Sequence, residues 1–165
     1  MSIKNFKPKK NSRHNEGYYR CKNPDKYHGD KNKIIYRSSY ELAIYTEFDL
    51  DPKVLKWSAE PPQLMIRYTY RVTGRQHSYY PDVYVEKLTK DNTIEKYVIE
   101  IKPMAFLKKP KQPTSKDRRK NIAYKKRLAH WLKIMDKKIA AEAYCRKRGL
   151  KYIFLTETFI NRKKS

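Results

Sequence analysis

The chain has 165 residues, with 40 Lys and Arg against 17 Asp and Glu, and so a formal net charge of +23. This length fits one domain, and no apolar run approaches the roughly 20 residues that a membrane-spanning helix needs. Because so positive a surface repels itself until it meets a polyanion, we expect double-stranded nucleic acid as a partner and no membrane. The chain has only four glycines and no Gly-rich phosphate loop, so we expect no nucleotide cofactor.

Residues 1–33 are polar, basic and irregular, and we expect them to form a basic N-terminal arm before a domain at 34–165. The arm either contacts phosphates and stacks on bases, or is a disordered solubilising tail. It carries basic residues and tyrosines in alternation: Lys7, Lys9, Lys10, Arg13, Arg20 and Lys22 with Tyr18, Tyr19 and Tyr27. The N-terminus lacks the apolar segment of a signal peptide, and the two cysteines, Cys21 and Cys145, do not indicate a disulfide scaffold. We therefore expect reduced thiols and synthesis in the cytoplasm.

The first predicted helix begins after Ser38. Ser38 and Glu41 have the spacing of a capping box, in which the two side chains satisfy free backbone donors at a helix start. Leu42, Tyr45 and Phe48 follow at helical spacing, and Pro52 predicts the end of the helix near residue 51.

Four strands are predicted next, at 54–59, 64–71, 77–86 and 94–102, as an antiparallel meander with turns at 73–75 and 90–93. A basic, proline-interrupted connection covers 103–113. Thr114 or Ser115 can then cap a long helix running to about Arg148, and Gly149 suits its C-terminal end. A last strand is predicted at 150–156, and because its stretch Tyr152-Ile153-Phe154-Leu155 is fully apolar we expect it at the centre of the sheet. The order of elements predicts an α/β fold, a sheet with flanking helices.

Asp82 and Glu100 are the candidate catalytic carboxylates. Side chains alternate along a strand, so Glu100 and Lys102 point the same way, and Asp82 on a neighbouring strand can join them. Two carboxylates at one place suit a hard divalent cation, here Mg²⁺ with Mn²⁺ as a substitute, and the Ile101 carbonyl can add a ligand. Lys102 would orient an attacking water and offset charge on a phosphate.

Each of these residues also has an ordinary structural interpretation. Asp82 can be an exposed acid at a sheet edge, and Glu100 with Lys102 can be a same-face ion pair of little consequence. Glu41 can cap the first helix, can bind the metal directly or through water, or can do both.

Basic residues crowd the region that follows the Glu100 strand. Lysine-rich helices are often only solvated surfaces, but this density beside the carboxylates favours a track for the DNA phosphate backbone. The candidate DNA-binding residues are Lys108, Lys109, Lys111, Arg118, Arg119, Lys120, Lys125, Lys126 and Arg127. None belongs to a base-reading motif, so we expect low sequence specificity.

Pro81-Asp82 with Glu100-Ile101-Lys102 resembles the signature of the PD-(D/E)xK nucleases. An ordered set of short motifs more closely resembles the head completion nucleases of T-even-type tailed phages, and the endonuclease subunit of two-subunit transposases is a more distant likeness. The motifs are Asn23-Pro24, Arg37-Ser38-Ser39-Tyr40-Glu41, Trp57-Ser58-Ala59-Glu60-Pro61, Tyr79-Tyr80-Pro81-Asp82, Ile99-Glu100-Ile101-Lys102-Pro103 and Ala143-Tyr144-Cys145-Arg146-Lys147-Arg148-Gly149.

The resemblance implies a restriction-endonuclease-like core, a mixed sheet with flanking helices. It implies Asp82, Glu100 and Lys102 as the active site and Glu41 as an accompanying acid. It also implies a Mg²⁺-dependent DNA endonuclease that acts on the packaged DNA end or the portal vertex before tail attachment. The partners would be portal or head–tail connector proteins, and the location would be the virion, with the host cytoplasm during assembly.

Two other functions stay open at this point. The chain can be a structural completion protein that binds DNA or the portal without meaningful catalysis. Less favoured is a junction-resolving nuclease or an RNA-binding protein, which a preference for four-way junctions or RNA over linear duplex would indicate.

Overall fold

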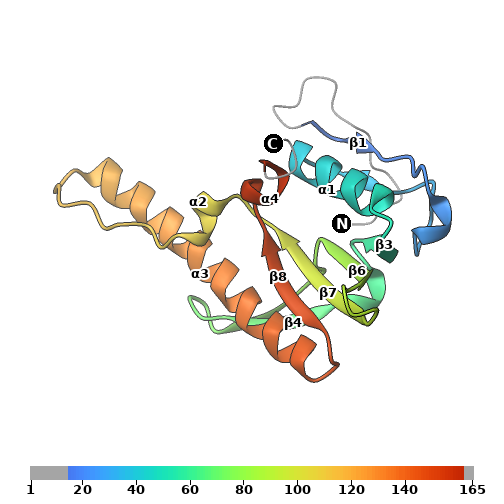
Figure 1. Ribbon diagram of the computed structural model, residues 1–165. Coiled ribbons are helices and arrows are strands. Elements are labelled where there is room, and N and C mark those ends of the chain that lie inside the picture. Colours follow the sequence, from blue (N-terminus) through green and yellow to red (C-terminus); the bar gives the residue numbers. More distant parts are fainter. Residues whose placement is uncertain (1–14, 162–165) are drawn as a thin grey trace.

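The computed structural model describes residues 15–161. Its centre is a four-stranded sheet, with helices on both faces (Figure 1). In chain order the elements are β1 (Gly17–Tyr18), η2 (Pro24–Lys26), β2 (Ile35–Tyr36), α1 (Ser39–Leu50), β3 (Val54–Ala59), η3 (Pro62–Leu64), β4 (Ile66–Tyr70), β5 (Arg75–Tyr79), β6 (Val83–Leu88), β7 (Ile94–Ile101), α2 (Met104–Leu107), α3 (Arg118–Arg146), β8 (Lys151–Leu155) and α4 (Glu157–Asn161).

The sheet has the strand order β3-β6-β7-β8. β3, β6 and β7 pair antiparallel, and β8 is parallel to β7, because α3 carries the chain back along the sheet between them. The predicted α/β class, a mixed sheet with flanking helices, is therefore confirmed. No helix within residues 15–161 is long and apolar enough to cross a membrane.

Helix α1 covers one face of this sheet. The Ser38 hydroxyl accepts a hydrogen bond from the Glu41 peptide N–H at 3.1 Å, so the predicted cap is formed. Ile44, Tyr45 and Phe48 then pack into the main core with apolar residues of β3, β6 and β7. On β7 this face holds Ile99 and Ile101.

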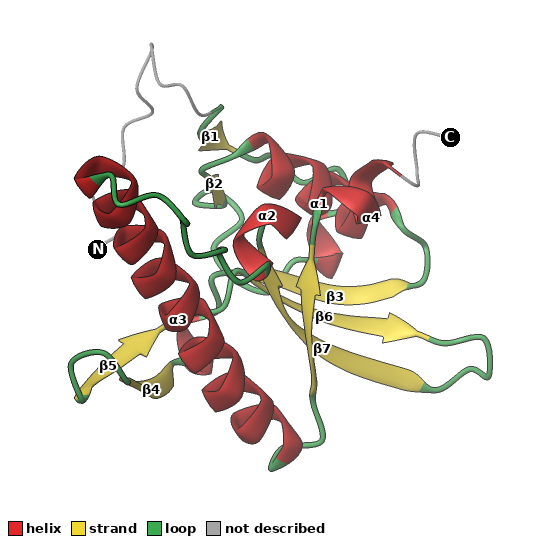
Figure 2. Ribbon diagram, turned by 90° about the vertical axis from the view of Figure 1, so that its left-hand side faces the viewer, coloured by secondary structure: helices red, strands yellow, loops and turns green. Residues whose placement is uncertain are grey.

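Helix α3 and the β4–β5 hairpin cover the opposite face (Figure 2). Val98 of β7 packs there against Cys145 of α3. Strand side chains alternate, so Glu100 follows Val98 onto the α3 face. This assignment decides which elements can reach the candidate carboxylates.

The prediction of one continuous strand at 77–86 is wrong. It is divided into β5 and β6 at Tyr80-Pro81-Asp82, and β5 pairs with β4 in a separate two-stranded sheet. Pro81 has no N–H to donate to a ladder, and the Asp82 carbonyl accepts from the Glu60 N–H instead. Asp82 therefore stands just before β6, where the chain enters the main sheet.

Two further predictions about the C-terminal half are corrected. Asp117, rather than Thr114 or Ser115, caps the long helix, because its side chain accepts from the N–H groups of Arg119 and Lys120. Strand β8 lies at the edge of the sheet and not at its centre. Its apolar run arises because both of its faces are covered: Tyr152 packs on the α3 side and Ile153 on the side of α1 and α4.

Residues 15–33 lie against the domain. Tyr19 and Tyr27 are buried in the main core around Trp57, so the expectation that these two tyrosines stack on nucleic acid is wrong. The carboxylate of Asp49, itself fully buried, accepts hydrogen bonds from the Tyr19 hydroxyl and from the N–H groups of Lys22 and Asn23. The basic residues Lys7, Lys9, Lys10 and Arg13 of the predicted arm lie outside the described residues.

Candidate active site

Asp82 and Glu100 meet at the end of β6 and β7. Val83 is opposite Ile99 in the antiparallel register, which brings Asp82 level with Glu100. The Ile101 N–H donates to Asp82 Oδ2 at 2.6 Å and fixes the orientation of that carboxylate. The loop carboxylate is thus attached to the motif strand by a backbone hydrogen bond.

Lys102 bridges the two carboxylates. Its Nζ lies 3.0 Å from Glu100 Oε1 and 3.4 Å from Asp82 Oδ2, and it also donates to the Ile101 carbonyl at 3.0 Å. Glu100 is only 3% exposed. A solvated surface ion pair therefore does not describe Glu100 and Lys102, since a carboxylate is rarely buried without a specific partner.

The ionised form of Glu100 is disfavoured in this arrangement. Burial, and then repulsion by Asp82, raise its pKa from 4.5 to about 7, although Lys102 and Lys137 oppose the shift. Its Oε2 is buried and has no hydrogen-bond partner among the described residues. An orphaned buried carboxylate oxygen beside a second carboxylate fits a divalent cation, which would supply the missing positive charge.

Lys137 of α3 is a second cationic side chain at this site, and sequence reasoning did not identify it. Its Nζ lies 4.0 Å from Glu100 Oε1 and 4.4 Å from the centre of the Tyr79 ring. Burial lowers its pKa. The signal was present in the sequence: Lys137 lies on the helix stripe of Ile134 and Ala141, both buried, where a lysine is unexpected.

Glu41 does not form a three-carboxylate cluster with Asp82 and Glu100 in the described residues. Its carboxylate accepts from the Arg37 N–H at 2.7 Å and from the Ser38 hydroxyl at 3.2 Å, so its direct contacts serve the α1 cap. Burial, and to a lesser extent the charge of Asp82, raise the pKa of Glu41. Glu41 is therefore coupled electrostatically to Asp82. Within residues 15–161 no three His, Cys, Asp or Glu side chains are grouped to hold a metal.

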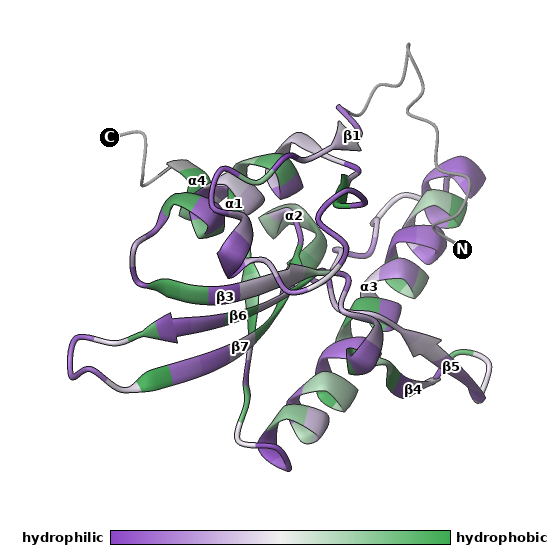
Figure 3. Ribbon diagram, turned by 90° about the vertical axis from the view of Figure 1, so that its right-hand side faces the viewer, coloured by the Kyte–Doolittle hydropathy of each residue, from purple (hydrophilic) through white to green (hydrophobic). Residues whose placement is uncertain are grey.

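The candidate DNA-binding residues all lie on the surface. They follow the α2–α3 connection and the first turns of α3, which extend beyond the sheet (Figure 1) and are mostly hydrophilic (Figure 3). These nine residues are Lys108, Lys109, Lys111, Arg118, Arg119, Lys120, Lys125, Lys126 and Arg127.

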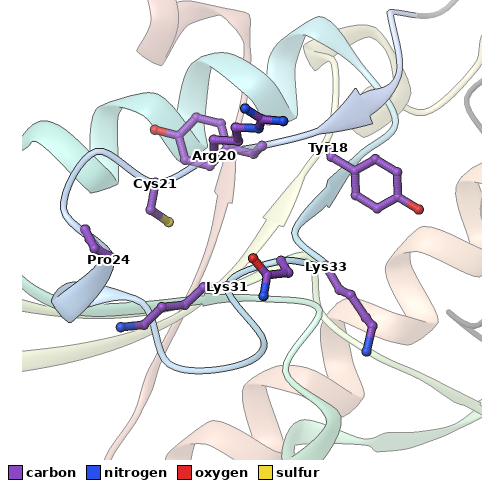
Figure 4. Close-up of a pocket in the computed structure, with 8 residues that line it drawn as sticks. Tyr18, Arg20, Cys21, Pro24, Lys31 and Lys33 are labelled. Atoms are coloured by element: carbon purple, nitrogen blue, oxygen red, sulfur yellow. The ribbon is translucent and has the colours of Figure 1, made fainter.

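A separate cavity of about 900 Å³ lies along residues 18–33, and Figure 4 shows Arg20, Lys31 and Lys33 around it. Cys21 also lines this cavity. Burial, and then the Asp49 charge, raise the pKa of its thiol to about 11, so a thiolate nucleophile is disfavoured there. Neither candidate carboxylate lines this cavity.

A mixed sheet with flanking helices is the fold of the restriction-endonuclease-like nucleases. Residues 51–157 match the family described as "TnsA-like endonuclease N terminal", which includes Asp82, Glu100 and Lys102 but not Glu41. The chain is also 35% identical over 140 residues to the "Head completion nuclease" of Enterobacteria phage T4, covering 82% of this chain and 87% of that protein. The chain therefore belongs to the TnsA-like endonuclease family.

Proposed function

We propose that this protein is a phage head completion nuclease that hydrolyses phosphodiester bonds in duplex DNA with Mg²⁺, or Mn²⁺ in its place. The observation that carries the proposal is the pair formed by Asp82 and the buried Glu100, which Lys102 bridges. Membership of an endonuclease family and the similarity to the T4 protein support the reaction class.

The carboxylates of Asp82 and Glu100, with the Ile101 carbonyl, would hold the cation. The orphaned Glu100 Oε2 is available to it, whereas Oε1 contacts Lys102. Glu41 would act on this centre electrostatically or through water, because its oxygens already accept cap hydrogen bonds. A bound divalent ion would supply Lewis acidity and lower the pKa of a water molecule.

Lys102 and Lys137 would supply the remaining positive charge. Lys102 Nζ already contacts both carboxylates and the Ile101 carbonyl. Once a cation offsets the carboxylates, the Lys102 ammonium would be free to orient a water and stabilise charge on the phosphate. Lys137 reaches Glu100 from α3 and would hold the Glu100 carboxylate in place.

The substrate is inferred from charge. The net charge of +23 and the exposed basic track of α3 and its preceding connection suit a DNA backbone. By analogy with the T4 relative, the protein would act on the packaged DNA end at the portal vertex before tail attachment. Its partners would then be portal or connector proteins, and it would reside in the virion head after assembly in the host cytoplasm.

The proposal is tested by incubating linear and supercoiled duplex DNA with the protein in Mg²⁺, Mn²⁺ or EDTA. Asp82→Asn is compared with Asp91→Asn, which removes the same charge from an exposed turn. We expect metal-dependent cutting that Asp82→Asn abolishes and Asp91→Asn retains. Salt-sensitive binding without cutting in any metal, with or without assembled heads, would contradict the proposal and favour a structural completion protein.

A further inference from the structure

A second feature of the α2–α3 region is an aromatic pocket of about 510 Å³ between these helices. Phe106 of α2 is 48% exposed, and its ring lies edge-on to His130 of α3 at 5.3 Å between centroids. Trp131 donates its Nε1–H to the Leu107 carbonyl at 3.1 Å. Because that hydrogen bond uses the only polar atom of the Trp131 side chain, the indole presents an apolar ring surface to the pocket.

Positive charge surrounds these rings. Lys108 and Lys109 line the pocket from the connection, and Lys126 and Arg127 line it from α3. Lys109 Nζ lies 5.9 Å from the centre of the Trp131 ring, at the range of a cation–π contact. Among the described residues that line this pocket there is no acidic side chain. The occupant is therefore expected to combine a flat apolar surface with negative charge.

We propose that this pocket binds an unpaired nucleobase at a single-stranded end or overhang of the DNA, with the flanking phosphates on the four cations. This inference rests on the proposed endonuclease function. In a duplex both faces of a base are covered by its neighbours, whereas an unpaired base can stack on an aromatic side chain. Such stacking tolerates every base, in agreement with the lack of a base-reading motif.

The chain places this pocket close to the catalytic candidates. Phe106 follows Lys102 by four residues, and Cα–Cα steps of about 3.8 Å limit the distance between their Cα atoms to about 15 Å. With a rise of about 3.4 Å per nucleotide along a strand, this limit corresponds to roughly four or five nucleotides. An overhang held in the pocket would thus place a nearby phosphate at Asp82 and Glu100.

The test uses the full-length protein in EDTA, where no cutting occurs, and duplex DNA with a five-nucleotide overhang that contains 2-aminopurine. The matched blunt duplex is the reference. Phe106→Ala is compared with Ile139→Ala, which removes an exposed apolar side chain further along α3. Phe106→Tyr restores an aromatic ring, and melting curves establish that all variants are folded.

We expect quenching of 2-aminopurine by the wild type and a preference for the overhang over the blunt end. Phe106→Ala should weaken overhang binding roughly 5- to 150-fold, since stacking contributes about 1–3 kcal/mol per base. Blunt-end binding should not change, and Phe106→Tyr should restore the preference.

Equal affinities for overhang and blunt end, or an unchanged overhang affinity in Phe106→Ala, would overturn the inference and leave the pocket to a protein partner. Failure of the proposed nuclease would look different. In that case the wild type would keep its Phe106-dependent overhang preference in EDTA but would not cut when Mg²⁺ is added.

Discussion

Replacing Glu100 by Gln is expected to stabilise the metal-free protein at neutral and higher pH. Burial and Asp82 raise the pKa of Glu100 from 4.5 to about 7 in the folded state. Between these two pH values the folded protein binds more protons than the unfolded chain, so the free energy of unfolding falls as pH rises. Below pH 4.5 the carboxyl is protonated in both states and the destabilisation disappears.

The magnitude follows from the pKa difference. One pKa unit corresponds to about 1.36 kcal/mol, so the ionised Glu100 lowers the stability by about 3 kcal/mol above pH 7. For a protein of this size that amounts to roughly 6–12 °C in the melting temperature. Lys102, whose pKa is raised by the two carboxylates, contributes stability that is lost only above 10.5, outside this pH range.

The assay is thermal or urea unfolding from pH 4 to 9 in EDTA. Glu142→Gln, a partly exposed glutamate on α3 that contacts Lys138, is the matched control and should change stability by less than about 0.5 kcal/mol. We also expect Mg²⁺ to stabilise the wild type more than Glu100→Gln, because a ligand of the folded state raises its stability. A Glu100→Gln protein that is less stable at pH 8, or a stability difference that does not change with pH, would show that the ionised Glu100 does not destabilise the fold.

Three further results are expected. Lys102→Met should lower single-turnover cleavage by about 10²–10³-fold with the fold intact, because a positioned donor to the reacting phosphate is lost; equal rates would exclude that role. Lys137→Met should lower cleavage by about tenfold and weaken Mn²⁺ binding in calorimetry, whereas Lys138→Met, whose side chain contacts Glu142, should do neither; the magnitude is that of one charge-assisted contact. Asp49→Ala should lower the free energy of unfolding by about 3 kcal/mol, because the Tyr19 hydroxyl and two backbone N–H groups lose their acceptor; urea unfolding that matched the wild type would mean that residues 15–33 add nothing to stability.

The sequence predicted the elements that local rules determine. Ser38 and Glu41 have capping-box spacing, and the helix begins there. Residues 54–59 were predicted as a short strand and form β3 with those bounds. The alternation of Glu100 and Lys102 along one strand was sufficient to predict their contact, since it depends only on the pleat.

What the sequence did not reveal depends on tertiary packing. The apolar run of β8 has the composition of a central strand, but helices on both faces, rather than neighbouring strands, bury it. Tyr19 and Tyr27 lie in a basic stretch, for which the sequence left open either nucleic-acid contact or a disordered tail. In the structure both rings pack on Trp57, and the Tyr19 hydroxyl donates to the buried Asp49. The spacing of Lys137 with Ile134 and Ala141 is visible in the sequence, but only the packing of α3 on the sheet shows that this stripe is the buried one.

The most direct test of the active-site assignment is single-turnover nicking of supercoiled DNA by the wild type and by a Glu100→Ala, Lys102→Ala double variant. Both proteins are assayed at equal concentration in Mg²⁺, after circular dichroism has established the same fold. We expect nicking by the wild type that EDTA stops and that the double variant lacks. Nicking by the folded double variant at the wild-type rate would contradict the assignment of the active site to Asp82, Glu100 and Lys102.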